Sequence, residues 1–148
     1  MSRWSEEAAR RSRERREAKY IAERKALQDK ELIASKGRAL WISMKSTLVR
    51  KCEEFNAEPG NAGVLWVVAN PSDVTVHCEQ QAGAIVGTFS DNAFVFSGKN
   101  GVAFAGSLYV RMTRDGSDVC ATDDTGHPVN FEDVANEMIE TLLEAGGW

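Results

Sequence analysis

The sequence predicts an α+β fold in which a long N-terminal helix, an antiparallel meander of five or six strands and a C-terminal helix follow one another, with both helices packed on one sheet face. Three observations lead to this prediction. Residues 5–55 contain no proline and one glycine, residues 64–122 contain short apolar or alternating segments separated by tight turns, and residues 131–145 have amphipathic helical spacing. Strands joined by tight turns pair antiparallel, and a sheet with one apolar face needs helices to cover it.

The first helix is expected over residues 5–55, because this segment is rich in Ala, Glu, Arg, Lys and Leu, which favour helices. Ser5 can cap its N-terminus, since a serine hydroxyl accepts hydrogen bonds from the first free backbone N–H groups. Two acidic–basic pairs in the first turns have the four-residue spacing that stabilises a helix, namely Glu6–Arg10 and Glu7–Arg11.

Apolar residues divide this helix into two parts. In the second part they recur every three or four positions, which predicts a stripe buried against the core. The stripe consists of Ile33, Gly37, Leu40, Trp41, Met44, Leu48, Cys52 and Phe55. In the first part only Tyr20 and Leu27 continue a seven-residue apolar series, and such a half-filled seam is a coiled coil only against a partner. We therefore expect a basic charged helical arm, residues 1–31, followed by a single α+β domain, residues 32–148.

The strands are expected to follow a turn at residues 58–63, where Pro59, Gly60 and Gly63 end the helix. Alternating or apolar runs predict strands at residues 64–69, 74–80, 84–89, 93–97, 102–113 and near 118–122. Gly106 falls on the apolar face of the fifth segment, which predicts a bulge or the close approach of a helix at this position.

The last helix is expected over residues 131–145, with Asn130 as its N-cap. Gly146 is the expected left-handed residue that ends it. Trp148 has two interpretations: it folds back onto the last helical turn, or it anchors a partner, since tryptophan is enriched among binding hot spots.

Charge is distributed very unevenly along the chain. Residues 1–51 hold 15 of the 18 Lys and Arg and seven acidic residues, whereas residues 52–148 hold three basic and 15 acidic residues. The formal charges of the two parts are therefore +8 and −12, although the whole chain carries −4. Charge segregated in this way attracts partners over a distance, and it favours self-association in which the arm of one copy lies on the body of another.

Several classes of protein and of site lack their signatures in this chain. No run of about 18 apolar residues occurs, which argues against a membrane span, and three widely spaced cysteines without a C-x-x-C pair argue against a disulfide framework or structural zinc. The expected protein is cytoplasmic, with reduced thiols and no membrane partner. His77 and Cys78 are neighbours on a strand and must point to opposite faces, while His127 lies in a loop near Asp123 and Asp124 without a matching ligand. We expect no catalytic, cofactor-binding or metal-binding residues.

The preferred functional hypothesis is a small non-enzymatic interaction or adaptor protein that uses its basic arm and acidic body to dock on a protein partner or on itself. The candidate partner-binding residues are Arg10, Arg11, Arg13, Arg15, Arg16, Lys19, Tyr20, Arg24, Leu27 and Trp148.

Two alternatives remain at this point. The arm can bind nucleic acid, because arginine-rich helices fill grooves, although interleaved glutamates weaken the attraction to phosphate. Alternatively, a small-molecule or enzymatic pocket lies between the first helix and the sheet, lined by Trp41, Trp66 and a thiol.

Overall fold

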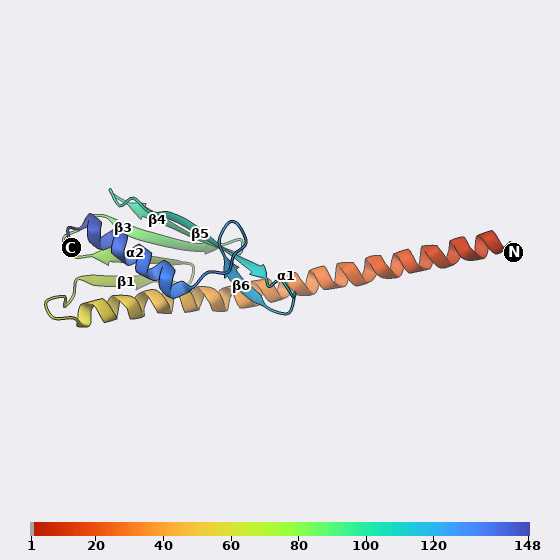
Figure 1. Ribbon diagram of the computed structural model, residues 1–148, viewed down its shortest axis with the longest axis horizontal. Coiled ribbons are helices and arrows are strands. Elements are labelled where there is room, and N and C mark those ends of the chain that lie inside the picture. The colour runs from red at the N-terminus through yellow and green to blue at the C-terminus, as the bar shows by residue number, and fades with distance from the viewer. Residues whose placement is uncertain (1) are drawn as a thin grey trace.

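The computed structural model describes residues 2–148 and confirms the predicted α+β architecture (Figure 1). Met1, which the predicted arm includes, lies outside the described residues. The elements in chain order are α1 (Arg3–Ala57), β1 (Leu65–Ala69), β2 (Asp73–Cys78), β3 (Ala84–Ser90), β4 (Ala93–Lys99), β5 (Ala105–Met112), β6 (Val119–Thr122) and α2 (Phe131–Ala145). The six strands form one sheet in the order of the chain, each antiparallel to the next.

Both helices lie on the same face of the sheet, as predicted (Figure 1). α1 contacts β1, β5, β6 and α2, whereas α2 covers β2 and β3. The opposite sheet face carries no helix of residues 2–148. The N-terminal part of α1 projects well beyond this two-layer body, and the two chain ends lie at opposite ends of the molecule (Figure 1).

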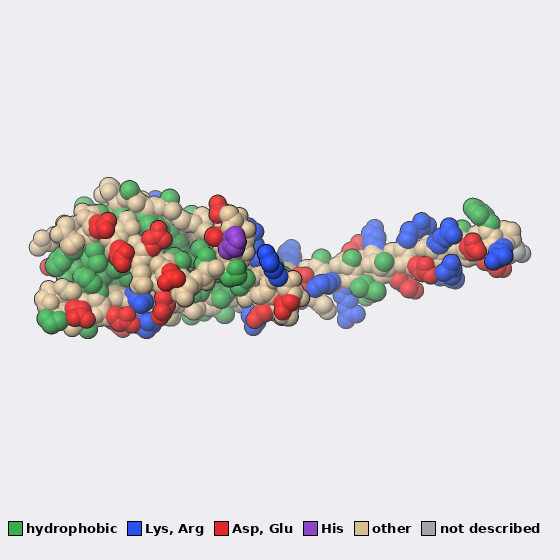
Figure 2. Space-filling view, viewed as in Figure 1, with side chains coloured by type: hydrophobic (Ala, Val, Ile, Leu, Met, Phe, Trp, Pro, Cys, Tyr) green, Lys and Arg blue, Asp and Glu red, His purple; other side chains and the backbone are tan. Residues whose placement is uncertain are grey.

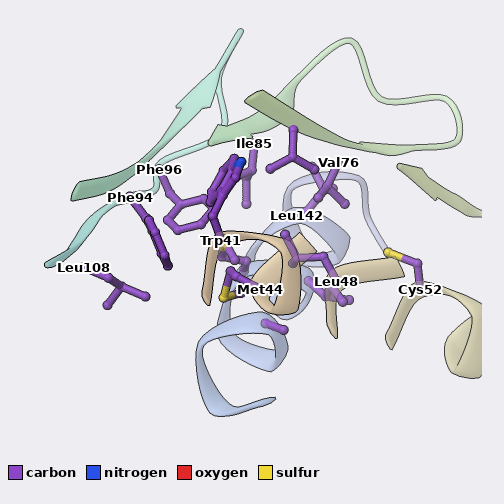
Figure 3. Close-up of a cluster of buried hydrophobic side chains, with 14 of the residues drawn as sticks. Trp41, Met44, Leu48, Cys52, Val76, Ile85, Phe94, Phe96, Leu108 and Leu142 are labelled. Atoms are coloured by element: carbon purple, nitrogen blue, oxygen red, sulfur yellow. The ribbon is translucent and has the colours of Figure 1, made fainter. Parts of the chain in front are cut away.

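The predicted stripe of α1 is buried in the core between α1, α2 and the sheet. Gly37, Trp41, Met44, Leu48 and Cys52 are buried, and Figure 3 shows Trp41 directed toward the phenylalanines of β4. The predicted stripe residues at its margins are only half-buried, namely Ile33, Leu40 and Phe55. The helix spacing is therefore confirmed by its most deeply buried positions.

Thr47 is a buried polar residue of α1 that the apolar spacing does not reveal. Its hydroxyl donates a hydrogen bond to the carbonyl of Ser43 at 2.9 Å, so the burial of Thr47 leaves no hydrogen-bond donor unpaired. The buried Trp41 also has its polar group paired: its indole N–H donates a hydrogen bond to the carbonyl of Pro71 at 2.9 Å.

The N-terminus of α1 differs from the prediction. Ser2, not Ser5, is the N-cap, and its hydroxyl accepts from the backbone N–H of Ser5 at 3.3 Å. The predicted pair Glu7–Arg11 is present at 3.9 Å, but Arg10 pairs with Glu14 at 3.2 Å and not with Glu6. The helix starts earlier than expected because Arg3 and Trp4 tolerate helical geometry and Ser2 supplies a cap of the same chemistry.

The predicted bulge or helix crossing at Gly106 is wrong. β5 begins at Ala105, and residues 102–104 cross close to Gly98 of β4. A Cβ atom on Gly98 would overlap the carbonyl group of Val102, so this position requires glycine. A Cβ atom on Gly106 would instead meet the ring of Phe104 at 3.6 Å, so a side chain rather than a helix lies nearest to this glycine.

The C-terminus of α2 also differs in one residue from the prediction. Gly146 has ordinary right-handed angles, and Gly147, with φ of +80°, is the left-handed residue. The N–H groups of Gly147 and Trp148 donate to the carbonyls of Glu144 and Leu143, which is the bonding pattern of a Schellman cap. Asn130 is the N-cap of this helix, as predicted.

Candidate functional site: the projecting helical arm

The arm is a helix without tertiary packing over most of its length. From Ala9 to Gln28 every side chain except Ser12 is exposed. Partial burial resumes with Asp29, Leu32 and Ile33, and the first fully buried residue after them is Gly37. α1 remains one unbroken helix across the predicted boundary between residues 31 and 32, so that boundary stays a prediction.

The arm exposes several large apolar side chains. The exposed fractions are 77% for Trp4, 64% for Tyr20, 65% for Ile21 and 57% for Leu27. Tyr20 and Leu27 are candidates from the seven-residue series, whereas sequence reasoning missed Trp4 and Ile21 because both fall outside it. Both could have been identified from the sequence, because each is a large apolar residue in a charged segment that has too few apolar residues to join a core.

The charged residues of the arm fall into two groups. Lys19, Arg10 and Arg11 form ion pairs within the helix, with Glu23 at 4.0 Å, Glu14 at 3.2 Å and Glu7 at 3.9 Å, respectively. The remaining basic candidates form no ion pair in the described part of the chain: Arg13, Arg15, Arg16 and Arg24. Basic and acidic side chains alternate along the arm in Figure 2, so its basic charge is not gathered on one continuous surface.

Trp148 lies far from the other candidate residues, at the opposite end of the molecule (Figure 1). Its backbone N–H completes the Schellman cap of α2, and its side chain is half-exposed beside Gly146. The structure therefore brings the arm candidates together on one helix and leaves Trp148 apart from them.

The outer face of α2 carries a row of acidic side chains, which we call the α2 stripe. Its members are Asp133, Glu137, Glu140 and Glu144, all exposed, and their spacing of four, three and four residues places them on one helical face. Acidic side chains gather over α2 in Figure 2. Glu132, beside the stripe, is paired: Arg50 donates a hydrogen bond to it and lowers its pKa.

The two histidines have structural partners. His77 stacks on Trp66 with ring centroids 5.2 Å apart on the helix-free sheet face, while Cys78 is buried on the other face. In the loop after β6, Asp123 accepts from the backbone N–H groups of Thr125 and His127, both at 2.9 Å, and the Thr125 hydroxyl does most to lower its pKa. These contacts shape a turn, and no group of three or more potential metal ligands is arranged around an ion site in residues 2–148.

The pocket expected between α1 and the sheet is formed only in part by the predicted residues, because Cys52 and Trp66 line a groove there and Trp41 does not. Trp41 is 1% exposed in the core, whereas Trp66 is 46% exposed on the opposite sheet face, so the two side chains cannot line one cavity. A shallow groove between α1 and β1 brings Cys52 near Trp66, but burial raises the pKa of Cys52 to about 12 and keeps the thiol protonated. Across the described chain, no buried side-chain polar atom lacks a hydrogen-bond partner.

Within residues 2–148, no helix is both long enough and apolar enough to span a membrane. No protein-family model, curated protein or solved structure matches this chain.

Proposed function

We propose that this protein is a small non-enzymatic interaction or adaptor protein whose helical arm docks on a partner protein. One observation carries the proposal: between Ala9 and Gln28 the arm is a fully formed helix in which every side chain except Ser12 is exposed, large apolar ones included. An isolated helix of this length is marginal in water, so the rigid α1 segment in the body supports it. A preformed helix loses little conformational entropy when a groove receives it.

The arm offers both kinds of contact that a helix-binding groove uses. Tyr20 and Leu27 lie seven residues apart on one side of the helix and supply apolar anchors. Arg13, Arg16 and Arg24 lie on the same side and retain donors that no acidic group of the described chain occupies. We also propose that the protein acts in the cytoplasm, in keeping with three cysteines that form no disulfide in residues 2–148.

Site-specific photo-crosslinking in cells tests this proposal. A benzophenone amino acid replacing Tyr20 is expected to crosslink to a defined partner protein, and Leu27→Ser in the same chain is expected to weaken that crosslink at least several-fold. Ile42 provides the matched control, because it is similarly exposed on α1 but lies beside the body. Identical crosslinking from positions 20 and 42, unaffected by Leu27→Ser, would contradict docking through the arm.

A second candidate function, nucleic-acid binding by the arm, is favoured by the four arginines without an acidic partner in the described chain, Arg13, Arg15, Arg16 and Arg24. Their guanidinium groups can contact phosphates, although residues 52–148 carry a formal charge of −12 that repels the nucleic-acid backbone. Filter binding of RNA and DNA to the wild type and to a variant with all four arginines changed to glutamine distinguishes this candidate. Equal retention by the two proteins would eliminate it.

A further inference from the structure

The α2 stripe is a row of four negative charges with no positive charge among them. Asp133 and Glu137, and likewise Glu140 and Glu144, lie four residues apart, a spacing at which like charges destabilise a helix. α2 contains no basic residue, and none of the four carboxylates forms an ion pair within residues 2–148. A cationic partner lying along this face would therefore remove a repulsion as well as add attractions.

One face of the arm is about as long as the α2 stripe and carries three arginines of opposite charge to it, with Glu17 and Glu23 beside them. We call it the Tyr20 face; it consists of Arg13, Arg16, Tyr20, Arg24 and Leu27, which follow one another at three- or four-residue spacing. Arg13 and Arg24 are 11 residues apart, as are Asp133 and Glu144, which corresponds to about 16 Å along each helix. The three arginines have no ion-pair partner in residues 2–148, so docking breaks no existing pair there.

The arm cannot reach the α2 stripe of its own chain. α1 is helical without interruption from Arg3 to Ala57 and carries the arm away from the body, while α2 lies beside the far part of the same helix (Figure 1). Folding the arm back would require breaking α1 in a segment that contains no proline and has its only glycine, Gly37, buried against Val110. The complementary surfaces can therefore meet only between two copies.

We propose that the Tyr20 face of one copy docks along the α2 stripe of a second copy. This inference rests on the proposed function of the arm and identifies the partner as the chain itself. The contacts are exposed ion pairs, each weak alone, so the association is weak, strengthened by low ionic strength and suppressed by salt.

Sedimentation velocity of the full chain at about 20 mM and about 500 mM salt tests the proposal, since the range of charge interactions shrinks strongly between these conditions. The wild type is expected to associate at low salt and to be monomeric at high salt. Two charge-reversal variants, Arg13→Glu/Arg16→Glu on the arm and Glu137→Arg/Glu140→Arg on α2, are each expected to weaken association about tenfold or more.

Mixing the two charge-reversal variants gives the decisive measurement. The reversed arm of one variant matches the reversed helix of the other, so the mixture is expected to recover association that neither variant shows alone. Glu79→Arg/Asp124→Arg is the matched control, because it changes net charge equally at two exposed acidic residues outside the α2 stripe. A wild type that stays monomeric at low salt, a mixture that does not recover, or a control that weakens association equally overturns the proposal.

The outcome separates this inference from the proposed function. If the wild type is monomeric in every salt condition but the crosslink from position 20 to another protein persists, self-docking is excluded and the arm remains a docking element. If association depends on the charge pairs and the crosslinked partner is a second copy of the chain, both hold.

Discussion

At the scale of single residues, the core is shaped by a glycine, Gly87, that faces the ring of Phe96. Phe96 of β4 is paired in register with Gly87 of β3 on one side and with Gly106 of β5 on the other. Its ring occupies the space above Gly87, where a Cβ atom would clash with Cε1 of Phe96. The same ring is a neighbour of Trp41, with centroids 6.2 Å apart. Gly87 thus makes room for an aromatic cluster beneath α1.

Gly87→Ala and Gly106→Ala form a matched pair of substitutions. Gly87→Ala is expected to lower the free energy of unfolding by about 2–3 kcal/mol, because the buried ring of Phe96 must shift to admit the methyl group. Gly106→Ala is expected to change stability by less than about 1 kcal/mol, since the nearest atoms lie at ordinary contact distance, 3.6 Å. Urea denaturation measures both. Equal losses would show that backbone conformation, not the ring, decides the cost.

Asp115 provides a pH-dependent contribution from the turn between β5 and β6. Its carboxylate accepts from the Thr113 hydroxyl at 2.6 Å and from the N–H and hydroxyl of Ser117 at 3.0 and 2.8 Å. These hydrogen bonds lower the pKa of Asp115 from 3.8 to about 2. The bond from the Thr113 hydroxyl contributes most, followed by those from Ser117. The depressed pKa means that the turn is stabilised above pH 3.8 and loses this stabilisation as the pH falls toward 2.

Comparison of the wild type with Asp115→Asn tests this contribution. The wild type is expected to be the more stable protein by a constant margin above about pH 5, and the margin is expected to shrink between pH 3.8 and about 2. Urea denaturation over this pH range measures the margin, and the carboxyl resonance of Asp115 gives the midpoint directly. A midpoint at the ordinary value of 3.8 would contradict the hydrogen-bonded turn.

At the scale of elements, α1 is one helix in geometry but lies in two environments. Residues 37–52 supply the buried stripe, whereas the exposed arm relies on helix propensity and ion pairs four residues apart, each worth about 0.3–0.5 kcal/mol. Local unfolding of the arm exposes almost no apolar surface, so it should open without the body.

Ala22→Gly and Ala39→Gly separate the two environments. Both alanines are exposed on α1, but Ala22 is in the arm and Ala39 is in the segment packed on the body. Ala39→Gly is expected to cost about 1 kcal/mol in the free energy of global unfolding, the usual helix penalty of glycine. Ala22→Gly is expected to leave global unfolding unchanged and to reduce only the helical circular dichroism. A similar cost at both positions would mean that arm and body unfold as one unit.

At the scale of the whole molecule, shape and charge follow the same division. The arm projects from one end, the acidic α2 lies on the body, and the two cannot meet within one chain (Figure 2). In this elongated molecule the basic arm and the acidic α2 are separated. Their opposite charges therefore stay unpaired with each other within one chain, whereas a compact protein usually brings such charges together.

Small-angle X-ray scattering at about 500 mM salt, where charge attraction is screened, tests this shape. The 55 residues of α1 span about 80 Å, so the longest dimension of the monomer is expected to be at least about that length. A compact chain of 148 residues would have a radius of gyration of about 15 Å. A value near 15 Å would show that the arm folds onto the body.

Much of this protein was determined by the sequence alone. Helical periodicity located the α1 stripe around Trp41, turn residues separated the strands, and Asn130 marked the start of α2, because each signal depends on neighbours within a few positions. The arm and two of its apolar anchors, Tyr20 and Leu27, were predictable because the segment lacks enough apolar residues to join a core.

Tertiary structure decided the features that depend on segments distant in sequence. Register across strands placed the close backbone approach at Gly98 and not at Gly106, and the sheet put Trp41 and Trp66 on opposite faces. The separation of the Tyr20 face from the α2 stripe within one chain likewise depends on the fold (Figure 1). Spacing along a chain shows which residues share a helical face. Only the packing of the elements determines which charged side chains can form ion pairs within the chain and which remain available to another molecule.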